Sequence, residues 1–134
     1  IGEYRAIALG VGSGVLSMVL LAFATQTWSA YAAMAAGLLQ GLAYPSMNAI
    51  MSKQAPANEQ GELQGGVASM MSLTTIVGPL LMTQTLGRFS APGAPLYFPG
   101  AAFMLAATLA TLSLLIVFRA RASASALPDA GGAG

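Results

Sequence analysis

Three polar side chains recur at four-residue intervals within an apolar stretch: Gln40, Tyr44 and Asn48. In an α-helix this spacing places them along one face. Amide and hydroxyl groups that face hydrocarbon are costly, so this face should turn toward protein or toward a water-filled cavity. The pattern therefore predicts that the three residues line a substrate cavity. The alternative is that they only hydrogen-bond a neighbouring helix.

Groups that catalyse reactions or hold cofactors are scarce. The chain has no His and no Cys, and it carries only five basic and four acidic residues. No nucleophile–base pair and no cluster of metal ligands can be assembled from these, so we predict no enzyme, no catalytic residue, no metal site and no cofactor. A basic patch that could bind nucleic acid is also absent from the sequence.

The elements that must position the polar residues follow from composition. Charged residues make up 7% of the chain, against about 25% in an ordinary soluble domain. Apolar stretches of about 20 residues match the thickness of a bilayer. We predict an all-α membrane protein with a four-helix transmembrane segment over residues 1–122 and helices at about 6–25, 30–52, 63–86 and 99–118. Residues 123–134, rich in Ala and Gly, are expected to form a disordered cytoplasmic tail.

One apolar stretch has a second interpretation. The run that follows Arg5 could belong to a cleavable signal peptide, but it is longer than the 7–15 apolar residues typical of such a peptide. We therefore favour a membrane span. The chain begins with Ile rather than Met, and we expect it to be a segment of a longer protein.

Two of the predicted helices contain breaks, and two contain small-residue faces. Pro45 lies within the second helix, where a kink is expected. Gly78-Pro79 lies within the third helix, where the kink could be either a hinge or a static bend. Small residues spaced for close helix packing fall on the first and second helices: Gly10, Gly14 and Ser17, then Ala33, Gly37 and Gly41.

Orientation follows from the basic residues. Four spans would place Arg5, Lys53, Arg119 and Arg121 on one side of the membrane and Arg88 on the other. The positive-inside rule then predicts that both termini are cytoplasmic. All nine charges fall outside the predicted hydrocarbon depth, whereas proton coupling normally needs a titratable group at that depth. We expect the coupling site to lie outside this chain.

A loop and the helix that follows it carry a family resemblance. The run from Glu59 through Gln60, Gly61, Glu62, Leu63, Gln64 and Gly65, followed by Ile76 to Leu81 with its Gly-Pro pair, resembles the loop and eleventh helix of bacterial tetracycline/proton antiporters of the major facilitator superfamily. Pro45 with Ser52 and Gln54 resembles the tenth helix of that family, and Phe98-Pro99-Gly100-Ala101 resembles the start of the twelfth. The resemblance extends over nearly all of the chain up to Arg121.

The resemblance implies helices nine to twelve of a twelve-helix transporter, in which the tenth helix borders the central cavity. It implies a drug exporter of the bacterial inner membrane that exchanges a tetracycline-like drug, as a chelate with a divalent cation, for protons. The expected partners are the lipid bilayer, the drug, protons and the missing N-terminal helices. Two alternatives are a non-transporting membrane fragment or assembly partner, and a small four-helix multidrug pump acting as a dimer. Such small pumps rely on a membrane carboxylate, which this sequence lacks.

Overall fold

The computed structural model describes residues 2–125, and all regular elements in that range are helical. The elements are α1 (Glu3–Ala22), α2 (Thr27–Ala36), the 3₁₀ helix η1 (Leu38–Leu42), α3 (Ala43–Gln54), α4 (Gln60–Ser90) and α5 (Ala101–Ser125). Three helices are long and apolar enough to cross a membrane, namely Glu3–Ala22, Gln60–Ser90 and Ala101–Ser123. The chain is an all-α membrane protein.

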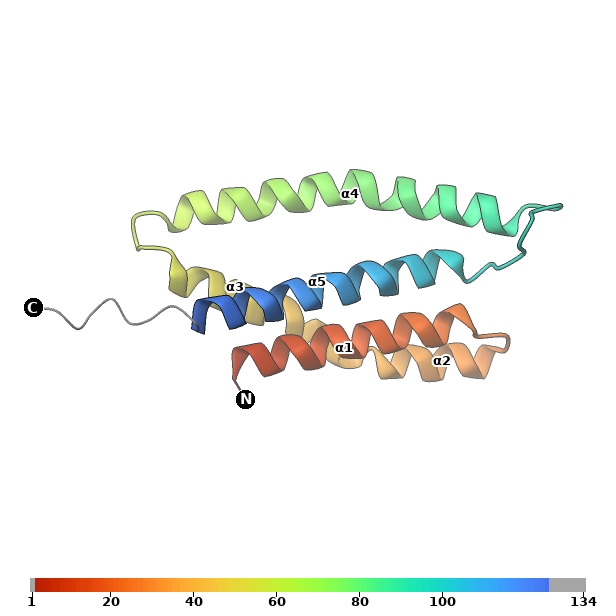
Figure 1. Ribbon diagram of the computed structural model, residues 1–134, viewed down its shortest axis with the longest axis horizontal. Coiled ribbons are helices and arrows are strands. Elements are labelled where there is room, and N and C mark those ends of the chain that lie inside the picture. The colour runs from red at the N-terminus through yellow and green to blue at the C-terminus, as the bar shows by residue number, and fades with distance from the viewer. Residues whose placement is uncertain (1, 126–134) are drawn as a thin grey trace, which may run out of the picture.

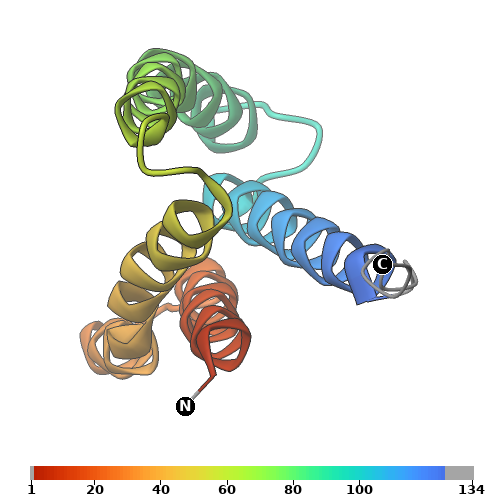
Figure 2. The ribbon, with the colours of Figure 1, turned by 90° about the vertical axis from the view of Figure 1, so that its left-hand side faces the viewer.

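Helix α1 lies at the centre of the packing. It contacts α2, η1, α3 and α5, while α4 contacts only α3 and α5 (Figure 1). Seen along the helices, α3 lies between α4 and the α1–α2 pair (Figure 2). Ile7 of α1 is 1% exposed, whereas α4 has no buried residue along its whole length. The interior is therefore small, and most large apolar side chains face outward.

Small residues allow α1 to approach the second segment closely. Gly10, Gly14 and Ser17 are all buried on α1. A Cβ added to Gly10 would lie 2.8 Å from the backbone nitrogen of Ala43, and one added to Gly37 would lie 2.9 Å from Ser17 Oγ. Ser13 Oγ also donates a hydrogen bond to the carbonyl of Ala36 at the end of α2. The seam expected from the sequence on α1 is present.

The second segment differs from the single helix expected over 30–52, because it consists of α2, η1 and α3. Pro45 has no N–H to donate to the Gly41 carbonyl, and the turn before it tightens into i→i+3 bonds such as Gln40 N–H to Gly37 O, 3.0 Å. A 3₁₀ helix has three residues per turn, so Gly37, Gln40 and Ala43 share the face that meets α1. Gly41, expected in this seam, has open space around its Cα.

The other helix bounds shift by a few residues. Helix α1 begins and ends three residues before the expected 6–25, α4 extends beyond 63–86 at both ends, and α5 runs past 118 to Ser125. Residues 123–125 of the expected tail are therefore helical, and residues 126–134 lie outside the described part. Gly100 lies directly before α5 and packs against the end of α1. A Cβ added to Gly100 would overlap the carbonyl oxygen of Ala22.

Candidate functional site

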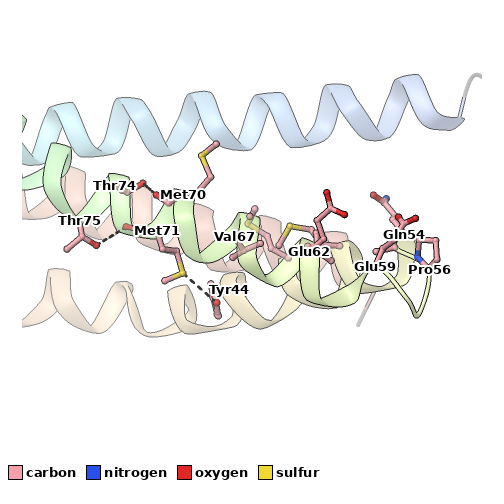
Figure 3. A pocket seen from close by; sticks show the side chains of 15 residues that line it. Tyr44, Gln54, Pro56, Glu59, Glu62, Val67, Met70, Met71, Thr74 and Thr75 are labelled. Carbon is pink, nitrogen blue, oxygen red and sulfur yellow. Dashed lines mark hydrogen bonds between the residues drawn. The ribbon is translucent and has the colours of Figure 1, made fainter.

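A groove of about 1020 Å³ runs between α3 and α4 (Figure 3). We call it the α3–α4 groove. Helix α3 contributes Tyr44, Met47, Met51 and Gln54, and the rest of the lining comes from the following loop and α4. It contains an aromatic ring, several flexible apolar side chains and two acids. This groove is the candidate functional site.

Four methionines line the groove, two from each helix: Met47, Met51, Met70 and Met71. Met70 is 69% exposed and Met71 is 51% exposed. Methionine side chains have three rotatable bonds and a polarizable sulfur, so they adapt to ligands of different shape. A surface rich in them suits binding that tolerates several related molecules.

Tyr44 joins the two sides of the groove. Its hydroxyl donates to Met71 Sδ at 3.7 Å, and the side chain is still 53% exposed. A thioether is a weak acceptor, so this hydroxyl can be given up to a better partner at small cost. Tyr44 is thus the polar group of α3 best placed to hydrogen-bond a molecule in the groove.

The two ends of the groove differ chemically (Figure 3). At one end lie Glu59 and Glu62 at the start of α4, where the helix dipole favours negative charge. At the other end Thr74 and Thr75 donate their hydroxyls to the carbonyls of Met70 and Met71, both at 2.8 Å. These threonines have their donors occupied within the helix. The groove therefore runs from an acidic mouth to an apolar end.

The structure separates the three side chains of the expected polar face. Tyr44 lines the groove, whereas Asn48 Oδ1 accepts a hydrogen bond from Gln64 Nε2 at 3.1 Å. Gln40 lies on the opposite side, where its Cδ would be 2.9 Å from a Cβ added to Gly14. The 3₁₀ turn causes this, because 120° per residue rotates Gln40 away from the face that Tyr44 and Asn48 share on α3.

The expected loop motif connects α4 to α3. Gln60 Nε2 donates to the carbonyls of Ser52 and Ala55, both at 2.7 Å, at the end of α3. Gln64, one turn later, makes the bond to Asn48. The two glutamines are four residues apart and so face the same way. Of the other motif residues, Glu59 lines the groove, Gly61 has open space around it, and the Gly65 carbonyl accepts from Ser69 Oγ at 2.9 Å.

The expected kink residues fall in two different settings. Pro45 follows η1 in the first turn of α3, whereas Gly78 and Pro79 lie inside α4, which continues as one helix through them. Helix α4 is bowed about its middle (Figure 1). The methionines were not among the expected site residues, although the four-residue spacing of Met47 and Met51 is a signal that could have pointed to them.

Comparison with known proteins identifies the family. Residues 1–133 match the family model described as Major Facilitator Superfamily. The chain belongs to this superfamily. Its members are multi-helix membrane transporters, and the chain is accordingly a multi-pass membrane protein. No solved structure matches it.

Several curated proteins are similar to part of this chain. The "Tetracycline resistance protein, class C" of Escherichia coli is 43% identical over 82 residues, which is 61% of this chain and 21% of that protein. The class G protein of Vibrio anguillarum is 36% identical over 83 residues, 62% of this chain and 21% of that protein. Human "Hippocampus abundant transcript-like protein 1" is 24% identical over 130 residues, 87% of this chain and 26% of that protein. The chain spans about a fifth of the length of the tetracycline resistance proteins it matches.

Proposed function

We propose that this chain is a segment of a bacterial drug exporter and that the α3–α4 groove forms part of its substrate path. The observation that carries the proposal is the groove itself, with Tyr44 and four methionines between an acidic mouth and an apolar end. Its volume of about 1020 Å³ matches the upper range of sites for drug-sized ligands, about 300–1,000 Å³.

The proposed substrate is a tetracycline-like drug, carried as a chelate with a divalent cation and exchanged for protons. The similarity to tetracycline resistance proteins supports the drug class. A multi-ring drug is largely apolar with hydrogen-bonding edges, and it would place its rings against the methionines and a polar edge near Tyr44. We place the protein in the bacterial cell membrane with both termini cytoplasmic.

Proton coupling normally needs a titratable group within the membrane. Of the four acidic residues, Glu3 and Asp129 lie near the ends of the sequence, and Glu59 and Glu62 lie at the start of α4. We therefore assign the coupling acid to other segments of the transporter. Within the proposal, this chain contributes binding surface rather than the proton site.

The test is drug resistance in bacteria that express the complete protein with Tyr44→Ala or Met70→Ala. Removing such a contact, worth about 1 kcal/mol when partly buried, should weaken drug binding about fivefold and lower resistance correspondingly. The matched control is Met34→Ala, because Met34 is 58% exposed on α2 and does not line the groove. Abundance in the membrane is measured for each variant. Wild-type resistance in both groove variants at normal abundance would refute the substrate path.

A second candidate is a membrane segment that binds other helices without transporting. The absence of any buried residue on α4 favours it, since such a long apolar helix should have partners. It predicts that Tyr44→Ala, Met70→Ala and Met34→Ala all leave resistance unchanged, while substitutions at exposed α4 positions outside the groove, such as Ile76, reduce assembly. The resistance measurement therefore separates the two.

A further inference from the structure

The beginning of α1 and the end of α5 lie at the same end of the molecule (Figure 1). The guanidinium carbon of Arg121 is 4.8 Å from the centre of the Tyr4 ring, which is cation–π distance. Arg5 and Arg119 are exposed and lie within two residues of Tyr4 and Arg121 in the sequence. We call these three arginines the basic end. The other cation at this end, Lys53, pairs with Glu3.

A second groove lies between α1 and α5. It has a volume of about 260 Å³ and is lined by Val15 and Val19 of α1 and by residues of α5 from Met104 to Leu112. Thr108 and Thr111 donate their hydroxyls to the carbonyls of Met104 and Ala107, both at 2.8 Å. Their methyl groups therefore complete an apolar surface. We call it the α1–α5 groove.

Helix periodicity aligns the basic end with the α1–α5 groove. On α5, Leu112, Thr108 and Met104 precede Arg119 by 7, 11 and 15 residues, spacings that return to the same side of a helix. On α1, Val15 and Val19 follow Tyr4 by 11 and 15 residues. The groove thus lies on the helix faces that carry Arg119 and Tyr4.

The groove begins deep within the leaflet that adjoins Arg119 and extends past the bilayer midplane. At about 1.5 Å per residue, its lining lies roughly 10–22 Å from the level of Arg119. One leaflet of hydrocarbon is about 15 Å thick, half of the whole core. An apolar channel at this depth beneath cationic side chains has the chemistry of a two-part molecule, with an anionic head and an acyl tail.

We propose that the basic end and the α1–α5 groove together bind an anionic phospholipid. The phosphate diester lies between Arg119, Arg121 and Arg5, because guanidinium groups match phosphate oxygens with paired N–H donors. One acyl chain follows the groove past Leu112 and Thr108. Basic pockets between transmembrane helices bind anionic head groups by this combination of charge and shape. Tyr4 holds Arg121 in place through the face of its ring.

Within residues 2–125, the acids nearest this end do not cancel the basic site. Glu3 is engaged by Lys53 at the end of α3. Glu59 and Glu62 are at the start of α4, which lies across the molecule from the end of α5 (Figure 2). The positive potential is therefore concentrated where α1 and α5 meet the membrane surface.

The test uses the protein at its full natural length, purified from membranes and mixed with phosphatidylglycerol or phosphatidylcholine of the same acyl chains. Bound lipids are counted by native mass spectrometry. We expect phosphatidylglycerol to be retained preferentially. Each arginine near the surface contributes about a fivefold preference, so the preference should fall about fivefold in Arg119→Gln and about 25-fold in the Arg119→Gln/Arg121→Gln double variant.

Two controls make the result specific. Arg88→Gln removes an exposed arginine at the end of α4 and should leave the preference unchanged. Thr108→Phe fills the groove and should reduce retention of phosphatidylglycerol with all arginines present. Arg119→Gln leaves the Arg121–Tyr4 contact intact, so its effect does not depend on loss of that packing, and circular dichroism checks the helix content of every variant.

Four outcomes would overturn the proposal. Equal retention of the two lipids would rule out the head-group site, and so would a loss of preference in Arg88→Gln equal to that in Arg119→Gln. Unchanged retention of phosphatidylglycerol in Thr108→Phe would rule out the groove as the acyl site. Displacement of the lipid by millimolar glycerol phosphate alone would show a free phosphate site in place of a lipid site.

Discussion

Two glycines on one helix have opposite environments. Gly10 of α1 faces the backbone of Ala43, whereas Gly12, half a turn away, has nothing within 4 Å of where a Cβ would be. Because both lie within a helix, each destabilises the fold by about 0.5–1 kcal/mol relative to alanine through the loss of backbone entropy. Only Gly10 gains a close helix contact in return.

Replacing these two glycines should therefore have effects of opposite sign. Gly10→Ala forces the α1–α3 contact apart and should lower the free energy of unfolding by about 1–3 kcal/mol, as overpacking does. Gly12→Ala should leave it unchanged or raise it by up to about 1 kcal/mol. The measurement is unfolding in mixed detergent micelles, followed by circular dichroism. A loss of stability in Gly12→Ala as large as in Gly10→Ala would show that the space around α1 is different from that described.

The residues on α1 were predictable because they depend on local spacing alone. Gly10, Gly14 and Ser17 share a face in any regular α-helix, and α1 is regular. The direction of the Gln40 side chain could not be predicted in the same way. It depends on which backbone conformation the chain adopts where Pro45 has no N–H to donate. The pairing of Gln64 with Asn48 needed the relative position of two helices, which no spacing within one helix supplies.

At the scale of elements, the least regular part is the join of α2, η1 and α3. The sequence predicted a kink at Pro45, and the structure has a 3₁₀ turn directly before it. A kink can be resolved by a bend, by a wider turn or by a tighter one, and sequence alone does not select among these. Gly37 directly before η1 and Gly41 within it make the tight turn less costly, because they add no side chain.

If Pro45 causes the tight turn, its removal should restore an α-helix. Pro45→Ala supplies an N–H for the Gly41 carbonyl, which should rotate Gln40 away from α1. Cross-linking of a cysteine pair at positions 14 and 40 should form readily with Pro45 and fall when Pro45 is replaced. A pair at positions 48 and 64, where the side chains are already in contact, is the reference. An unchanged yield at 14 and 40 would assign the turn to the glycines.

At the scale of the whole molecule, most of the charged residues lie at one end and an aromatic cluster lies at the other. The Glu3–Lys53 pair and the Arg121–Tyr4 contact join three helices at one end. At the other end the rings of Phe23 and Phe98 lie 5.7 Å apart, and Trp28 is 83% exposed beside Tyr31. Basic residues favour the cytoplasmic side, and tryptophan and tyrosine favour the membrane interface.

This arrangement predicts the orientation in cells. The chain has no native cysteine, so single cysteines can be introduced at Lys53 and at Arg88. A membrane-impermeant maleimide should label the cysteine at position 88 in intact bacterial spheroplasts. The cysteine at position 53 should be labelled only after the membrane is permeabilised. The reverse pattern would place both termini outside and contradict the positive-inside assignment.

Helix α4 is the longest helix of residues 2–125. It crosses the length of the molecule with no side chain enclosed by the rest of residues 2–125. Gln60 and Gln64 hydrogen-bond α3, but most substitutions elsewhere along α4 meet little steric resistance from the described helices. An intolerant position in a saturation mutagenesis experiment that lies outside these contacts and outside the α3–α4 groove points to a neighbour beyond the described helices. The tolerated and the intolerant positions along this helix would thus show which side faces lipid and which side faces protein in the assembled transporter.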